Sequence, residues 1–175
     1  KGLDFSKIFY RPDMPEEVAR RHLEHQDHGL EKGIDNSLID QAKEALADQV
    51  PVRIESKVKN ANRSVGAMLS NQVATRYGHA GLPDETITVD FEGTAGQSFG
   101  VFLAKGITFN LRGDANDYVG KGLSGGRIVI HPSNDFSGAS SNNIVVGNTV
   151  LCGAVEGEVY FSGVAGERFA VRNSG

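Results

Sequence analysis

The chain has 175 residues and a formal net charge of −4, and its 18 basic and 22 acidic side chains are mixed along the sequence. Nucleic acids and anionic membranes are therefore poor partners, because both select basic surfaces. No apolar run approaches the ~20 residues of a membrane span, and no signal-peptide pattern opens the sequence. The single cysteine, Cys152, cannot form an internal disulfide. These features predict a cytoplasmic protein.

The first 84 residues are predicted to form an α-rich leader. Pro15, followed by two acids and then by Gly29, is the pattern of a first helix. Asn62 or Ser64 can cap a later helix, which Gly78 ends. Alternating apolar residues between these helices are typical of a strand. The expected elements are helices over 15–28 and 35–49, a strand over 50–58 and a helix that ends at Tyr77.

The second part of the chain repeats with a period of 20 residues. Apolar segments at 87–91, 107–111 and 127–131 are separated by this period, and the glycines of the first three copies keep it too. A fourth copy follows at 159–169, after an insert rich in Ser, Asn and Gly. It aligns with the third copy at an offset of either 30 or 31 residues.

A period near 20 that carries one short strand and several glycines is typical of a solenoid, whose turns must stack to bury a core. The sequence therefore predicts a mainly β fold. We expect a single-stranded right-handed parallel β-helix over residues 85–175, on which the α-helical leader of residues 1–84 packs. Its last turn would be an open end able to pair with another copy. Stacking predicts one interior column of Val89, Phe109 and Val129 and a second of Phe91 and Leu111.

Glycine is expected at the corners of such a fold, because it alone adopts φ > 0 without steric cost. If Gly126 has a left-handed backbone, its replacement by valine should cost roughly 1–3 kcal/mol. The glycines predicted to be structural are Gly93, Gly96, Gly100, Gly113, Gly120, Gly126, Gly163 and Gly166.

Three histidines, His22, His25 and His28, have an H-x-x-H-x-x-H spacing that could serve a metal ion. On a helix they would spread over ~120° of the surface, and the neighbouring Arg20 and Arg21 repel a cation. A polar helix face or a partner contact is therefore favoured. We predict no metal ligand in this chain.

The stretch from Gly120 to Gly125 matches the G-x-G-x-x-G form of dinucleotide-binding loops. That loop needs a helix after it, whereas an apolar strand follows here, so turn glycines are favoured. Acidic and amide side chains in two other stretches are more typical of turn hydrogen bonding than of calcium binding or catalysis. We predict no catalytic and no cofactor-binding residue in this segment. The acidic and amide residues are Asp114, Asn116, Asp117, Asn142, Asn143 and Asn148.

Four longer stretches carry a resemblance to a known family: Gln26–Glu31, Gly93–Gly100, Gly113–Gly126 and Gly163–Gly175. Through them the chain resembles, over essentially its whole length, the C-terminal glycine-rich (GXGXG) β-helix domain of the glutamate synthase large subunit. Relatives continue beyond the last residue, so we expect a segment of a longer polypeptide. The glycine-rich subunit of formylmethanofuran dehydrogenase is a more distant relative, and it remains an alternative.

This resemblance implies a non-catalytic structural domain in an oxidoreductase that makes two glutamates from glutamine and 2-oxoglutarate during ammonia assimilation. The domain would brace the glutamine amidotransferase and FMN synthase domains of the same subunit. FMN and an iron–sulfur cluster would be bound elsewhere, with either NAD(P)H or ferredoxin as electron donor. Two rival classes remain: a β-helix enzyme acting on carbohydrate, and a stand-alone β-helix that binds a phosphate ligand at the Gly120–Gly125 turn.

Overall fold

The computed structural model describes residues 2–10 and 12–175. Contacts divide the chain into a unit of residues 1–30 and a unit Glu31–Gly175. In the first unit, residues 15–28 form turns and extended chain, so the helix predicted there is wrong. Its large apolar side chains, Val18 and Leu23, are exposed. A helix of this length with no apolar face to bury is marginal in water.

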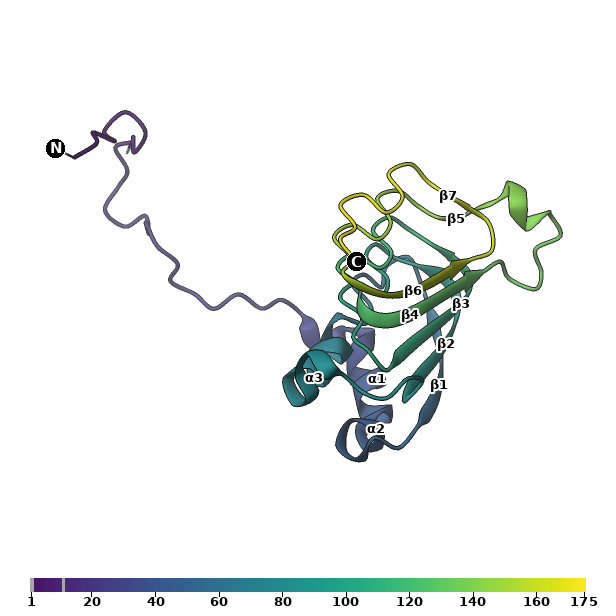
Figure 1. Ribbon diagram of the computed structural model, residues 1–175. Coiled ribbons are helices and arrows are strands. Elements are labelled where there is room, and N and C mark those ends of the chain that lie inside the picture. Colours follow the sequence, from purple (N-terminus) through teal and green to yellow (C-terminus); the bar gives the residue numbers. More distant parts are fainter. Residues whose placement is uncertain (1, 11) are drawn as a thin grey trace. The chain divides into compact units, whose positions relative to one another are not determined.

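The second unit combines helices and strands around one core (Figure 1). The helix predicted over 35–49 is present as two helices parted at Ala42, the strand predicted over 50–58 is present, and the third predicted helix does end at Tyr77. The helical elements are η1 (Leu30–Lys32), α1 (Ile34–Gln41), α2 (Lys43–Asp48), α3 (Ala67–Tyr77), η2 (Gly78–Ala80) and η3 (Ser140–Asn142). The strands are β1 (Val52–Val58), β2 (Ile87–Ala95), β3 (Ile107–Ala115), β4 (Ser124–His131), β5 (Ile144–Val146), β6 (Glu156–Phe161) and β7 (Val164–Ala165).

The strands form one seven-stranded parallel sheet in the order β1-β2-β3-β4-β6, and β5 pairs with β3 and β7. The fold is therefore α/β, and the predicted mainly β right-handed parallel β-helix with an α-helical leader is wrong. The physical reason is that the early segment does not stand apart from the sheet. β1 pairs with β2, with Val52 opposite Ile87, and the fully buried Leu38 of α1 and Leu69 of α3 belong to the same core as the strands.

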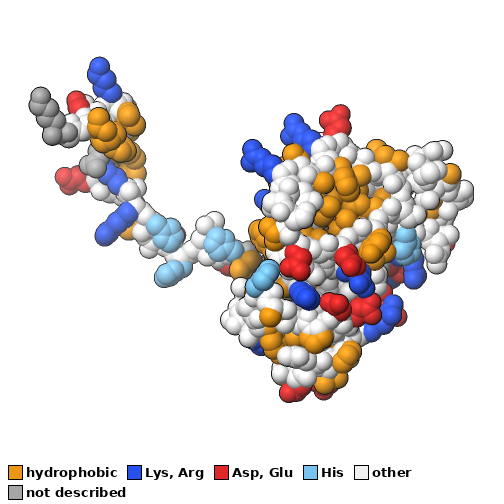
Figure 2. Space-filling view, in the orientation of Figure 1, with side chains coloured by type: hydrophobic (Ala, Val, Ile, Leu, Met, Phe, Trp, Pro, Cys, Tyr) orange, Lys and Arg blue, Asp and Glu red, His pale blue; other side chains and the backbone are white. Residues whose placement is uncertain are grey.

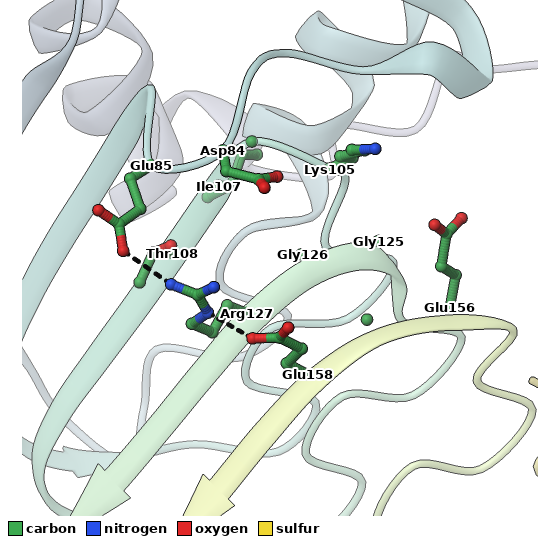
Figure 3. Close-up of a pocket in the computed structure, with 12 residues that line it drawn as sticks. Asp84, Glu85, Lys105, Ile107, Thr108, Gly125, Gly126, Arg127, Glu156 and Glu158 are labelled. Atoms are coloured by element: carbon green, nitrogen blue, oxygen red, sulfur yellow. Dashed lines mark hydrogen bonds and ion pairs between the residues drawn. The ribbon is translucent and has the colours of Figure 1, made fainter.

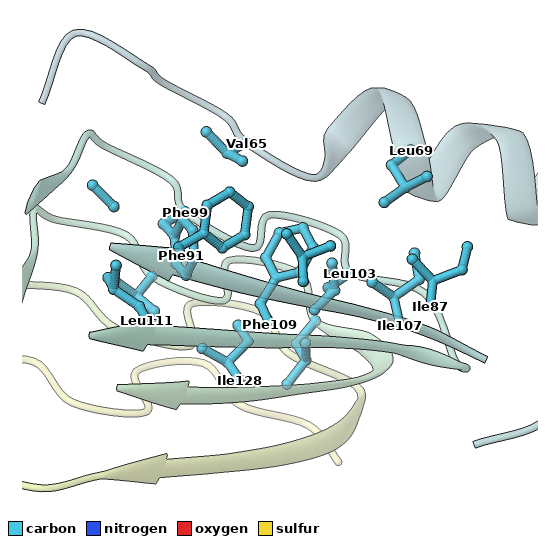
Figure 4. Packing of buried hydrophobic residues seen from close by; sticks show 14 of the residues in the cluster. Val65, Leu69, Ile87, Phe91, Phe99, Leu103, Ile107, Phe109, Leu111 and Ile128 are labelled. Carbon is cyan, nitrogen blue, oxygen red and sulfur yellow. The ribbon is translucent and has the colours of Figure 1, made fainter. Parts of the chain in front are cut away.

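β2 and β3 keep the 20-residue period. Val89 lies opposite Phe109 and Phe91 lies opposite Leu111, so these predicted pairs are confirmed. Phe91 and Phe109 meet Phe99, with ring centroids 5.0–5.3 Å apart. Figure 4 shows these rings between the strands and the segment that leads into α3. The aromatic cluster therefore joins the helical layer to the sheet.

The period changes between β3 and β4. Phe109 lies opposite Ile128, an offset of 19 residues, so the predicted column of Val89, Phe109 and Val129 is wrong in its third member. Ile128 is fully buried, whereas Val129 is half-buried on the other face of the strand. A slip of one residue exchanges the two faces of a strand. Arg127 lies two positions before Val129 and therefore on the same face of the strand. Its charge could have shown from the sequence that this face points away from the core.

Candidate functional site

A layer of stacked turns, which we call the turn layer, faces the core beside the sheet. Its turns are residues 98–102, 118–122, 149–153 and 168–172. Backbone hydrogen bonds join each turn to its neighbours. In the second turn, the N–H of Gly120 donates to the carbonyl of Phe99 in the turn before it, and the N–H of Gly122 donates to the carbonyl of Cys152 in the turn after it, both at 2.9 Å.

The first, third and fifth residues of every turn have left-handed backbones, with φ between 52° and 68°. Because of this alternation, the N–H of the first residue points toward the following turn and the N–H of the third residue points toward the preceding turn. Four of the twelve positions are glycine: Gly100, Gly120, Gly122 and Gly153. A left-handed backbone costs other residues roughly 1–2 kcal/mol each, so the hydrogen bonds between turns must offset that strain. The sequence analysis did not predict that the non-glycine positions of these turns are left-handed. Only alignment of the four turns with one another, matching these positions to the glycines, could have revealed it.

The predicted structural glycines lie in different settings. Gly100 and Gly120 belong to the turn layer, with φ of 68° and 62°. Gly126 is not left-handed, so that reason for the cost of a valine there does not hold; a Cβ would instead lie 2.7 Å from Leu103 Cγ. The others lie in or beside strands: Gly93 in β2, Gly96 just after β2, Gly113 in β3, Gly163 just before β7 and Gly166 just after it.

A carboxylate from α1 caps α3. Asp35 Oδ1 accepts a hydrogen bond from Gly66 N at 2.9 Å, while Oδ2 accepts from Met68 N at 2.8 Å and Leu69 N at 3.2 Å. The cap therefore comes from another helix and not, as predicted, from the residues just before α3. Asp35 is only 4% exposed. Burial raises its pKa, and the three backbone donors offset this only in part.

Arg127 of β4 is the centre of a polar groove of about 280 Å³ (Figure 3). Its guanidinium donates to Glu158 of β6 and to Glu85 of the loop before β2, each at 2.7 Å. Arg127 lies opposite Glu158, so the offset of 31 residues was the correct alternative. The hydrogen bond to Glu158 raises the pKa of the guanidinium above its ordinary value. One side chain thus ties together β4, β6 and the entry to β2.

The charge of this groove opposes an anionic cofactor such as a flavin phosphate. Four carboxylates line it against two cations, and Arg127 already serves two of the carboxylates. The lining acids are Asp84, Glu85, Glu156 and Glu158, and the second cation is Lys105.

A second polar cluster ties three strands on the outer face of the sheet. Asp90 of β2 accepts hydrogen bonds from Arg53 of β1 at 3.0 Å and from Asn110 of β3 at 2.8 Å. Burial acts to raise the pKa of Asp90, but these two donors outweigh it and leave the pKa below its ordinary value. The carboxylate is thus kept ionised as a link between strands.

The histidines singled out from the sequence lie in the first unit, where no helix aligns them; the rings of His22 and His25 are 6.5 Å apart. Within the part of the chain that the structure describes, no three His, Cys, Asp or Glu side chains gather as metal ligands. An iron–sulfur cluster needs several cysteine ligands, and the chain contains only Cys152, half-buried in the turn layer. Its residues do not fit such a cluster.

The strand predicted to follow the glycine stretch is confirmed, and part of the predicted turn hydrogen bonding is present, whereas the absence of phosphate binding, calcium binding and catalysis stays a prediction. β4 begins at Ser124, so a strand and not a helix follows the G-x-G-x-x-G stretch. Asp117 Oδ1 accepts from Asn148 N at 2.7 Å, and Asn116 Oδ1 accepts from Asp117 N at 2.7 Å. These side chains satisfy backbone groups of the turns.

On the face shown in Figure 2, acidic and basic side chains are interspersed with uncharged ones. Over the described residues, no helix combines the length and apolar character that crossing a membrane requires. Fold and site together define a glycine-rich α/β domain whose polar clusters link strands to one another.

The chain belongs to the GXGXG motif family, whose model matches residues 35–175. It is 52% identical over 165 residues, 94% of its length, to the NADH glutamate synthase of Saccharomyces cerevisiae, and covers 8% of that protein. It is 44% identical over 174 residues, 99% of its length, to the NADPH glutamate synthase large chain of Bacillus subtilis, and covers 11% of it. A ferredoxin-dependent glutamate synthase of Synechocystis is 49% identical over 131 residues, 75% of the chain and 8% of that protein. The expected resemblance to the glycine-rich domain of the glutamate synthase large subunit is confirmed, and the chain spans about a tenth of its relatives' length.

Proposed function

We propose that this chain is the glycine-rich domain of a glutamate synthase large chain and acts there as a non-catalytic brace. The observation that carries this proposal is the match to glutamate synthases, which runs through 94% and 99% of the chain in two of them. The parent enzyme would be a cytoplasmic oxidoreductase that makes two glutamates from glutamine and 2-oxoglutarate.

The bracing role is supported by how the second unit is tied together. Asp35 fastens α1 to α3, Asp90 links β1 to β3, and Arg127 links β4 to β6. Parallel ladders and the turn layer add backbone hydrogen bonds between successive turns of the chain. Such cross-linking resists deformation. A stiff domain could hold the amidotransferase and FMN synthase domains at the separation that ammonia transfer between them requires.

The partners in this proposal are the other domains of the same large chain, and FMN and the iron–sulfur cluster are bound in those domains. The functional division into residues 1–84 and 85–175 stays a prediction. Self-association of two copies through the open end of the repeat region stays a prediction as well.

The test measures glutamate formation from glutamine and 2-oxoglutarate by the intact polypeptide that contains this chain, with NADH, NADPH or reduced ferredoxin. We expect glutamate formation with one of these donors and none from the 175-residue chain alone. An intact polypeptide that makes no glutamate would contradict the parent activity. Turnover by the chain alone would contradict the non-catalytic role.

Bracing has a separate readout, the ratio of glutamine-dependent to ammonia-dependent glutamate formation. Asp35→Ala, which detaches α3 from its cap, should lower this ratio, because only the glutamine reaction needs the two active sites held in position. Asp40→Ala is the matched control, since Asp40 is an exposed carboxylate on the same helix. Equal ratios in both variants would refute bracing.

A further inference from the structure

Phe102 has a left-handed backbone, which costs free energy, and its side chain is nevertheless largely exposed. It is the fifth residue of the first turn, with φ of 54°, and it is 55% exposed. The equivalent residues of the next two turns are Gly122 and Gly153, which adopt this backbone without strain. Phe102 thus combines backbone strain with an exposed aromatic ring, and strained residues of this kind concentrate at functional sites.

The ring of Phe102 is held in a defined place. It lies over Gly122, where an added Cβ would come within 2.5 Å of Phe102 Cδ1. There it forms one wall of a groove of about 530 Å³, which we call the α3 groove. Small residues of α3, among them Ala67 and Ala74, line it as well. A groove of this size, lined by an aromatic ring and by a helix, can accept a large apolar side chain.

The charge of the α3 groove is one-sided. Lys105 and His79 line it, and its lining contains no Asp or Glu, although Lys105 also borders the Arg127 groove with its four carboxylates. Among the described residues Lys105 takes part in no ion pair, and the one ion pair of His79 is with Glu156, at 3.7 Å. An occupant with a carboxylate next to its apolar side chain would complement both the ring and the free ammonium group.

We propose that the α3 groove docks another part of the same polypeptide, through a large apolar side chain that inserts against Phe102 and an adjacent carboxylate that pairs with Lys105. This inference rests on the proposed function. It draws on the fact that relatives named glutamate synthase are about ten times longer than this chain, which leaves most of such a polypeptide available as the partner. Aromatic anchors in desolvated pockets are the residues that carry most binding energy at interfaces.

The experiment compares hydroxyl-radical oxidation of Phe102 in the intact polypeptide and in the 175-residue chain alone. Docking should lower the oxidation rate of Phe102 by about fivefold or more in the intact polypeptide, because the ring becomes desolvated. Tyr118 is the internal control, since it is also exposed and left-handed but lies outside the α3 groove. Equal oxidation of Phe102 in the two samples would overturn the proposal.

A variant separates docking from folding. Phe102→Gly should leave the melting temperature of the chain unchanged or raise it, because glycine relieves the left-handed strain. In the intact polypeptide it should nevertheless speed amide hydrogen exchange across Ala67–Tyr77, whereas Tyr118→Gly should not. Identical exchange in the two variants would refute a docking role for Phe102.

Two further outcomes are distinguishable. Protection of Phe102 in the isolated chain that grows with its concentration would identify a second copy as the occupant and overturn the proposal. Protection of Phe102 in an intact polypeptide that makes no glutamate would support docking while the proposed parent activity fails.

Discussion

Replacing Asp35 with alanine tests whether α1 is fastened to α3 through one buried carboxylate. The substitution removes the acceptor of three backbone N–H groups at the start of α3. Gly66 and Leu69 are buried, so water cannot replace the lost acceptor there, whereas Met68 is half-buried. Two buried unsatisfied donors at about 1.5 kcal/mol each give a loss of about 3 kcal/mol in the free energy of unfolding.

For a unit of this size, that loss lowers the melting temperature by roughly 6–12 °C. Calorimetry or circular dichroism at neutral pH measures it directly. Asp40→Ala is the control, because Asp40 makes only an exposed ion pair with Lys43 at 2.9 Å and should change the free energy of unfolding by less than about 0.5 kcal/mol. If the two variants melt within about 2 °C of each other, the capping argument is refuted.

Burial raises the pKa of Asp35 in the folded state, so the pH-dependent part of its contribution to stability is complete below the unfolded pKa of about 3.9 and is lost as pH rises through the folded pKa, while the hydrogen bonds of the cap remain. The stability of the wild type relative to Asp35→Asn, from thermal melts at a series of pH values, should therefore fall as pH rises above about 4. Ala170→Gly should stabilise the chain by about 0.5–1 kcal/mol in denaturant titrations, because Ala170 is left-handed with φ of 52°. Gly120→Ala should destabilise it by about 2 kcal/mol in the same assay, since the new Cβ would lie 2.7 Å from Leu151 Cδ2. Arg127→Met should cost less than about 1 kcal/mol, with the difference vanishing in about 1 M salt, because its two ion pairs are partly exposed.

Local sequence signals predicted several elements of the second unit correctly but failed over residues 15–28, where the predicted helix is absent. The alternation of 50–58 marked β1, and the glycine after Tyr77 marked the end of α3. Neither signal says which surface an element packs against. β1 carries no copy of the repeat, so its place beside β2 followed only from three-dimensional pairing. Because the pairing of β1 with β2 could not be predicted, the sequence indicated a β-helix with a separate leader where the structure has an α/β fold.

The repeat itself was reliable where its period held and misleading where it changed. Between β3 and β4 the offset of 19 residues is hidden by Val129, which is as apolar as its buried neighbours. The candidate site was hidden for another reason. Asp35 lies 31 residues before Gly66, and Phe102 carries no mark of the left-handed backbone it adopts. Contacts between distant residues and strained non-glycine positions leave no local pattern to read.

The hydrogen bonds of the sheet join neighbouring strands, and those of the turn layer join neighbouring turns. The unit should therefore resist force differently in different directions. A force directed along the strands loads every bond of a ladder in shear, so the bonds resist it together. A force directed across the strands, from β1 toward β6, pulls neighbouring strands apart and can break the hydrogen bonds of one strand pair while those of the other pairs stay intact. A domain that must transmit force without deforming is therefore best attached to its neighbouring domains at the two ends of its strands.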